Sequence, residues 1–224
     1  MASKERIPKK KKRTLSHSKH LSVPLYKTDD IKFEVSRKIL HIICGLLIIL
    51  SIQFELLTPL ILFEVFILLL CISLLSRKVW IPIWNFLIRK FERKEWKKSF
   101  PGRGLIYFVA GAVISLYLFP RNLALASIMI ATFGDSSSCI FGILYRKITN
   151  KNHHKKLIFG TVGGFFAGLI GASFYIALPE AALASAAGLL AEFVEMDLNK
   201  SPLDDNIAVP LASATAVLIL RKFL

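Results

Sequence analysis

The chain has 224 residues, of which 54% are hydrophobic, and its mean hydropathy is +0.55. It carries 30 lysines and arginines against 15 aspartates and glutamates, a formal net charge of +15. The apolar residues fall in long runs, which excludes an ordinary soluble domain and predicts an integral membrane protein. Because the basic residues lie between these runs, anionic headgroups and a phosphorylated substrate are the expected partners rather than nucleic acid.

The first 30 residues are polar and contain the run Lys9-Lys10-Lys11-Lys12-Arg13. A block of like charges of this kind predicts disorder. We therefore interpret residues 1–30 as a disordered basic tail and residues 31–224 as one polytopic membrane domain. The tail is expected to act as a simple topogenic signal, and electrostatic attachment to anionic lipid is the alternative.

About seven apolar segments predict membrane-spanning helices, so the expected fold class is an all-α integral membrane protein. Between the second and third segments, residues 77–103 interleave aromatic and basic residues, which predicts an interfacial helix lying on the membrane. The sequence assigns no role to Glu64, Glu192 or Glu195. The seven segments are Ile39–Phe54, Leu56–Leu75, Leu105–Phe119, Leu123–Leu144, Ile158–Leu178, Ala181–Phe193 and Ile207–Leu220.

The stretch from Gly134 to Gly142 has the strongest chemical character in the chain. It follows an apolar run, and a carboxylate at bilayer depth costs about 2.5–3.5 kcal/mol. Asp135 therefore requires a cation as its partner, and a metal ion is the expected one. The surrounding serines and glycines leave room for a ligand to approach the backbone. The alternative is a polar capping patch next to a closely packed interface of small residues.

Two further stretches offer groups that could bind an anion. Arg37 and His41 are four residues apart, so they share one face of the first predicted helix. His41 is either a phosphate contact or proton acceptor, or a hydrogen-bonded packing residue. The turn Pro101-Gly102-Arg103-Gly104 is either a plain loop or a device that brings Arg103 to an anion.

A basic segment ending in Lys155-Lys156 precedes the glycine-rich stretch Gly160-Thr161-Val162-Gly163-Gly164, which we interpret as the start of a helix. A helix N-terminus offers free backbone amides to phosphate. Gly160, Gly164 and Gly168 also follow the GxxxG spacing that allows close helix packing. Packing is the favoured reason for Gly164, Gly168 and Gly171.

The distribution of Lys and Arg predicts the topology. Twelve precede Ile39, nine lie in residues 77–103 and five lie in residues 145–156. With seven spans and a cytosolic N-terminus, all three basic regions face the cytosol. Asp135, the Gly160 turn and the Asp204-Asp205-Asn206 loop then reach the same membrane surface, which indicates one shared site.

Five short motifs occur in a fixed order over about residues 36–212, and together they resemble the CTP-dependent lipid kinases. That family includes dolichol kinase, phytol kinase and the yeast-type diacylglycerol kinase, and it is similar to the CDP-diacylglycerol synthases. One position departs from the family pattern, because Phe159 stands where a glutamate usually precedes the glycine. The five motifs are Arg37-Lys38-Ile39-Leu40-His41, Gly102-Arg103-Gly104, Gly134-Asp135-Ser136, Lys156 with Gly160-Thr161, and Asp204-Asp205-Asn206 with Pro210-Leu211.

The resemblance implies Mg²⁺-dependent transfer of the CTP γ-phosphoryl group to a lipid alcohol, at the cytosolic face of a cell or endoplasmic reticulum membrane. It implies catalytic roles for Asp135, His41 and Lys156. The implied metal ligands are Asp135, Asp204 and Asp205. The implied nucleotide and phosphate contacts are Arg37, Arg103, Gly134, Gly160, Thr161 and Asn206.

Two other functions stay open at the level of sequence. The first is a cytidylyltransferase that makes a CDP-lipid on a related scaffold, although its usual acidic and glycine-rich C-terminal segment is not found. The second is a non-catalytic membrane protein or small transporter. Polar residues gathered at one face, rather than at mid-membrane, argue against transport. The sequence does not distinguish an isoprenoid alcohol from diacylglycerol as the acceptor.

Overall fold

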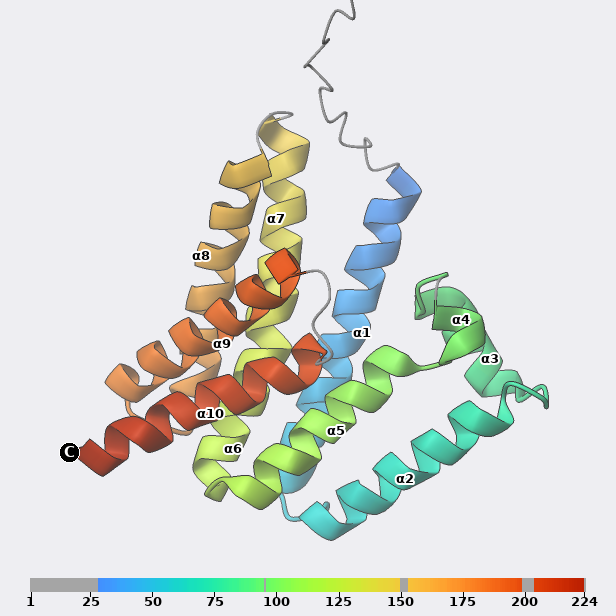
Figure 1. Ribbon diagram of the computed structural model, residues 1–224, viewed down its shortest axis with the longest axis horizontal. Helices are drawn as coiled ribbons and strands as arrows, with labels where there is room; N and C mark the ends of the chain where they lie inside the picture. The colour runs from blue at the N-terminus through green and yellow to red at the C-terminus, as the bar shows by residue number, and fades with distance from the viewer. Residues whose placement is uncertain (1–27, 95, 150–152, 199–203, 224) are drawn as a thin grey trace, which may run out of the picture.

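The computed structural model describes residues 28–94, 96–149, 153–198 and 204–223, and these residues form helices without any strand (Figure 1). The predicted all-α class is therefore confirmed. Of the predicted tail, residues 1–27 lie outside the described ranges and residues 28–30 already belong to α1. The helices are α1 (Thr28–Gln53), α2 (Pro59–Leu75), α3 (Pro82–Phe91), α4 (Trp96–Ser99), α5 (Arg103–Leu118), α6 (Arg121–Met129), the π-helical turn η1 (Ile130–Gly134), α7 (Asp135–Thr149), α8 (His153–Ala172), α9 (Leu178–Leu198) and α10 (Asp205–Phe223).

Three helical stretches in the described part of the chain are long and apolar enough to cross a membrane. They are Asp30–Gln53, the continuous run Arg121–Tyr145 and Asp205–Phe223. Three more apolar helices are shorter, namely Pro59–Leu75, Arg103–Leu118 and Ile158–Ala172. These helices indicate a membrane protein, whereas the number of seven spans stays a prediction.

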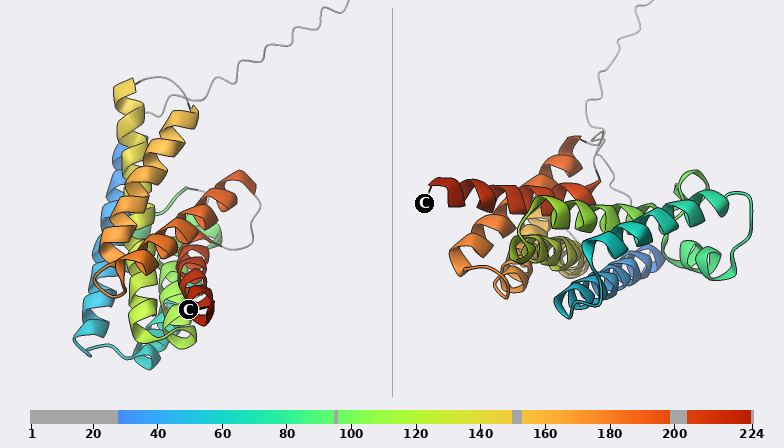
Figure 2. Two further views of the ribbon diagram at one scale, coloured as in Figure 1. Left: turned by 90° about the vertical axis from the view of Figure 1, so that its left-hand side faces the viewer. Right: turned by 90° about the horizontal axis from the view of Figure 1, so that it is seen from below.

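The run from α6 through η1 into α7 lies at the centre of the molecule. Residues Leu123 to Ile128 are buried, and the core also takes Phe108 from α5 and Val209 from α10. In Figures 1 and 2, α1, α7 and α8 run roughly parallel, while α5 and α10 lie at a slant to them. Helix α7 packs along α8, α10 along α9 and α5, and α1 against α7. This arrangement surrounds the start of α7, which carries Asp135.

Small residues allow α8 to approach its neighbours closely. A Cβ atom on Gly164 would stand 2.7 Å from the carbonyl oxygen of Gly134, and one on Gly168 would stand 2.7 Å from the hydroxyl of Ser185. These spaces are too short for a methyl group. The packing interpretation of Gly164 and Gly168 is therefore confirmed.

The predicted interfacial helix at residues 77–103 is two short helices, α3 and α4. The chain between them turns extended at Glu92, with φ −93° and ψ 142°, so a single helix is wrong for this segment. Gly102 follows at a φ of 82°, a conformation that favours glycine. The ring of Trp84 occupies the place where a Cβ of Gly102 would stand, and this contact fixes the entry into α5.

Candidate functional site

The site is built around a buried ion pair between Lys38 of α1 and Asp135 of α7. Lys38 Nζ lies 2.5 Å from Asp135 Oδ2, and the two side chains are only 5% and 8% exposed. Asp135 thus has the cationic partner that its depth requires. The sequence analysis did not foresee this lysine, which α1 supplies, and a metal ion at Asp135 stays a prediction.

The start of α7 is set by the π-helical turn η1. A wide turn of this kind inserts an extra residue into a helix and is frequent at functional sites. Thr132 within the turn occupies the place where a Cβ of Gly45 would stand, so α1 and η1 touch closely. This close contact brings the Lys38 side of α1 against Asp135.

His41 lies one turn after Lys38 on α1. Its Nε2 is 3.4 Å from the carbonyl oxygen of Ala131, and its ring centroid is 4.3 Å from that of Phe108. The ring therefore makes the contacts expected of a hydrogen-bonded packing residue, which was one of the two predicted alternatives. A role of His41 toward phosphate or the lipid hydroxyl stays a prediction.

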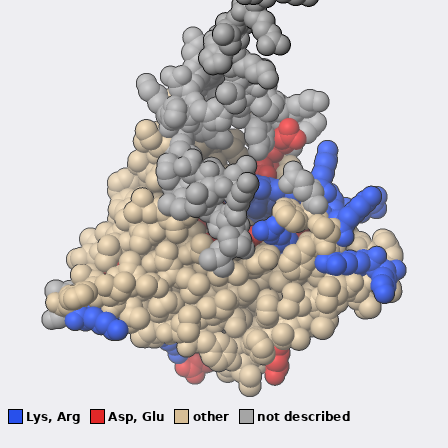
Figure 3. All heavy atoms as spheres, viewed as in Figure 1, with Lys and Arg blue, Asp and Glu red and all other residues tan. Residues whose placement is uncertain are grey.

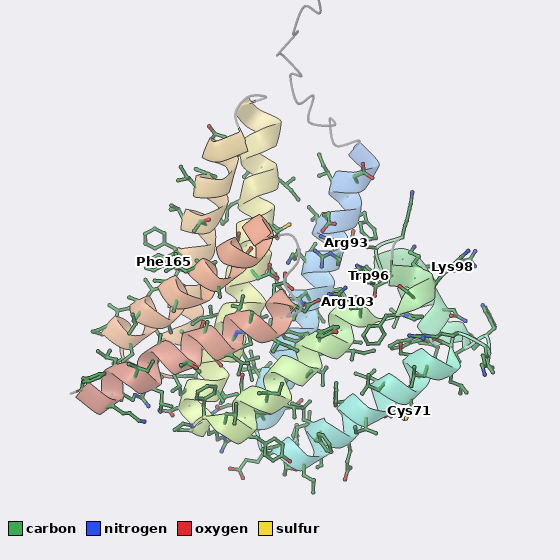
Figure 4. The ribbon with its side chains drawn as sticks, in the orientation of Figure 1. Cys71, Arg93, Trp96, Lys98, Arg103 and Phe165 are labelled. Carbon is green, nitrogen blue, oxygen red and sulfur yellow. The ribbon has the colours of Figure 1, made fainter. Side chains whose placement is uncertain are left out.

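The loop before α10 forms a second polar group with Arg103. Arg103 Nε donates to Asp204 Oδ2 at 3.2 Å, and the guanidinium lies 4.0 Å from the ring of Trp96 (Figure 4). Asn206 Nδ2 donates to Asp204 Oδ1 at 2.6 Å and to Asp205 Oδ1 at 3.0 Å. The structure thus brings Arg103 and the Asp204-Asp205-Asn206 motif together, although about a hundred residues separate them.

These two groups adjoin each other, and Glu192 of α9 joins them. The charges of Asp135, Asp205 and Glu192 interact with one another and with Lys38. Glu192 Oε1 accepts a hydrogen bond of 3.2 Å from Ser138 Oγ. Among the described residues, Glu192 Oε2 is buried without a hydrogen-bond partner. Lys38 is therefore paired with Asp135, and the charges of Asp205 and Glu192 also act on this pair.

Arg37 lies at the rim of the site. Its guanidinium donates to Glu34 Oε2 at 2.9 and 3.1 Å, and Arg93 donates to Glu34 Oε1 at 3.2 Å. Arg37 therefore shares the Glu34 carboxylate with Arg93, and its contact with phosphate stays a prediction. Glu34 and Lys38 are both buried residues of α1, but the sequence analysis did not name Glu34 and named Lys38 only as part of a motif, without a role. Glu34 and Lys38 are four residues apart and therefore share one face of α1, and this spacing beside Arg37 is the sequence feature that could have identified them.

The predicted helix start at Gly160 is wrong. Helix α8 begins at His153, so Gly160 and Thr161 lie inside it, where amides bond to carbonyls of the preceding turn. A Cβ on Gly160 would stand 2.7 Å from the carbonyl oxygen of Ser138, which indicates packing against α7. Gly160 and Thr161 therefore do not form a helix N-terminus. Their contact with phosphate stays a prediction without that support.

The remaining predicted positions are placed only in part. Lys156 belongs to α8, but its side chain lies outside the described part of the structure. Gly134 ends η1, with its backbone packed against Gly164. Phe159, at the position of the family's usual glutamate, packs its ring against Phe141 and Tyr145 at centroid distances of 6.2 and 5.3 Å.

Fold and site together indicate a helical membrane protein with a buried ion pair between Lys38 and Asp135. The chain is 31% identical over 186 residues to the uncharacterized protein MJ1137 of Methanocaldococcus jannaschii. This alignment covers 81% of the chain and 91% of that protein. The chain belongs to the same protein family as MJ1137.

A more distant similarity links the chain to an enzyme. It is 26% identical over 142 residues to CTP-dependent diacylglycerol kinase 1 of Schizosaccharomyces pombe. The match covers 57% of the chain and 62% of the kinase, so it spans less than two thirds of that protein. It supports a distant relationship to lipid kinases. No protein-family model matches the chain, and no solved structure matches it.

Proposed function

We propose that this protein transfers the γ-phosphoryl group of CTP to a membrane lipid alcohol. The observation that carries the proposal is the buried Lys38–Asp135 pair. Phosphoryl transfer needs positioned charges of both signs more than it needs a covalent catalyst. The kinase relative supports CTP as donor, and its name supports diacylglycerol as one acceptor. An isoprenoid alcohol is the other acceptor class.

We propose that carboxylates of the site take part in holding a magnesium ion, since oxygen ligands are those that Mg²⁺ prefers. No group of three or more His, Cys, Asp or Glu in the described residues is close enough to hold an ion. Mg²⁺ needs only one or two protein carboxylates beside substrate phosphates. We propose Asp135 and Asp205 as ligands, with Asp204 next to them, and the bound ion would neutralise phosphate charge.

The cations of the site are proposed to bind the CTP phosphates. Lys38, Arg37 and Arg103 each hold a carboxylate in the protein alone. An arriving phosphate offers these cations a new anionic partner and leaves the carboxylates to the metal. We therefore add Lys38 to Arg37 and Arg103 as a phosphate contact. Asn206 would orient the nucleotide or the metal, as its bonds to both aspartates allow.

Isotope transfer tests the reaction. We expect purified protein with Mg²⁺ to pass label from γ-labelled CTP to dioctanoylglycerol or to a polyprenol, and to leave lipid unlabelled with α-labelled CTP. A kinase attacks the γ-phosphorus and releases CDP, whereas a cytidylyltransferase attacks the α-phosphorus and releases pyrophosphate. Lipid labelled from the α position would replace the proposal by CDP-lipid synthesis. No transfer from either position, across both acceptor classes, would reject both enzymes.

The site is also proposed to face the cytosol, and single cysteines test this. In a background without Cys44, Cys71 and Cys139, Lys98→Cys reports on the basic segment and Glu55→Cys on the loop after α1. Both side chains are exposed. In sealed vesicles we expect an impermeant maleimide to label Lys98→Cys from the cytosolic side and Glu55→Cys only from the opposite side. The reverse pattern would contradict the predicted orientation.

A further inference from the structure

The segment formed by residues 77–103 has an unusual charge for its length. It contains nine Lys and Arg residues against Glu92 and Glu95, so its formal charge is 9 − 2 = +7. Figure 3 shows basic side chains gathered on the side of the molecule where α3 and α4 lie. A basic cluster is by itself most often a solvated face. A second property of the segment separates it from that case.

The same segment exposes large apolar side chains. Trp80, Ile83 and Phe86 are 69%, 78% and 61% exposed, while Trp84 on the inner face is 6% exposed. Lys90 Nζ lies 5.7 Å from the ring centroid of Phe86, so cation and aromatic ring share one patch. Apolar side chains with adjacent cations are the pattern of a helix that lies in the headgroup region of a membrane.

The segment is attached to the candidate site at two points. Arg93, whose side chain is 51% exposed, holds Glu34 of α1, and Arg103 holds Asp204 before α10. Trp96 lies under the Arg103 guanidinium, and Figure 4 shows Arg93, Trp96 and Arg103 on the side of α4 that faces α1 and α10. These bonds fix the segment on the bundle, with Lys98 and its basic neighbours on the outer side.

We propose that residues 77–103 form a binding surface for anionic phospholipid headgroups of the membrane that holds the protein. Phe86 and Ile83 would enter the acyl boundary, and Lys94, Lys98 and Arg89 would contact lipid phosphates. Charge complementarity selects this occupant, because basic residues near an anionic leaflet gain attraction that a zwitterionic leaflet does not give. The surface is independent of the reaction that the site performs.

The chain provides its own reporter for this binding. Its three tryptophans, Trp80, Trp84 and Trp96, all lie within the segment. Full-length protein is reconstituted into bilayers in which one lipid is brominated, since bromine quenches only tryptophans that contact it. We expect brominated phosphatidylglycerol to quench at a lower mole fraction than brominated phosphatidylcholine, by about fivefold or more. The difference should shrink at high salt because exposed charges are screened.

Charge variants test the assignment to these residues. Lys94→Gln with Lys98→Gln should bring the two quenching curves close together. The matched control, Lys32→Gln with Lys222→Gln, removes two exposed charges outside the segment and should leave the selectivity unchanged. Equal quenching by both lipids in the unaltered protein would overturn the proposal. So would a selectivity that the first pair leaves intact, or that both pairs reduce equally.

Discussion

Asp135→Asn is expected to destabilise the protein strongly and to abolish phosphoryl transfer. The change removes the charge that neutralises Lys38, and both side chains are almost fully buried. Removing one partner of a buried ion pair costs about 3–5 kcal/mol, because the other charge stays buried without compensation. The midpoint of thermal unfolding in detergent measures the first effect, and isotope transfer from γ-labelled CTP measures the second.

A double variant separates the two effects. Lys38→Met with Asp135→Leu replaces the pair by apolar side chains, which is often neutral for stability. We expect it to recover most of the thermal midpoint that Asp135→Asn loses, while transfer stays absent. Unchanged stability of Asp135→Asn would contradict the buried pair. Transfer by the double variant would show that the pair serves the fold alone.

Gly111→Ala is expected to separate α5 from α10. A Cβ atom on Gly111 would overlap the carbonyl oxygen of Asn206. The next nearest atoms, the carbonyl carbon of Asn206 and the Cα of Ile207, also belong to the backbone. A backbone neighbour cannot rotate away, so the helices must shift, at about 1–3 kcal/mol. The shift displaces the Asp204-Asp205-Asn206 group. We expect a lower thermal midpoint and a loss of CTP binding, measured by equilibrium dialysis.

Gly104→Ala provides the matched control on the same helix. A Cβ atom there would meet nothing within 4 Å. Alanine also favours a helix by up to about 1 kcal/mol over glycine, so stability should be equal or slightly higher. If both alanines had the same effect, the close contact between α5 and Asn206 would not be responsible. If Gly111→Ala left CTP binding intact, the loop would not belong to the nucleotide site.

The helices and the meeting of distant motifs could be predicted from the sequence, because long apolar runs and the distribution of basic residues constrain both. Arg103 and Asp204 were expected on one surface, and they form an ion pair. The identity of their partners could not be predicted. Whether Arg103 meets a phosphate or Asp204 depends on side-chain distances that spacing along one chain does not fix.

The other differences between the sequence predictions and the structure have local causes. Lys38 follows Arg37 and looks like one more basic residue at the start of a helix, and only the packing of α1 on α7 shows that it points inward. Glu192 has no nearby motif, and its place follows from the contact of α9 with Ser138. The start of α8 was misjudged because Gly160 suits a helix end and an interhelical contact equally, and the second is realised.

The π-helical turn Ile130–Gly134 also makes the direction of Asp135 depend on how the helix before it is wound. Each residue of a regular α-helix turns the following side chains by about 100°, and a π-helical turn, with its i→i+5 hydrogen bonds, accommodates one residue more than an α-helical turn. If the same residues were wound as a regular α-helix, Asp135 would turn away from Lys38 by about one residue's rotation. Among relatives of this chain, a change in this wide turn that is not matched by a change in residue number would therefore alter the chemistry of the site while the membrane helix around it persists.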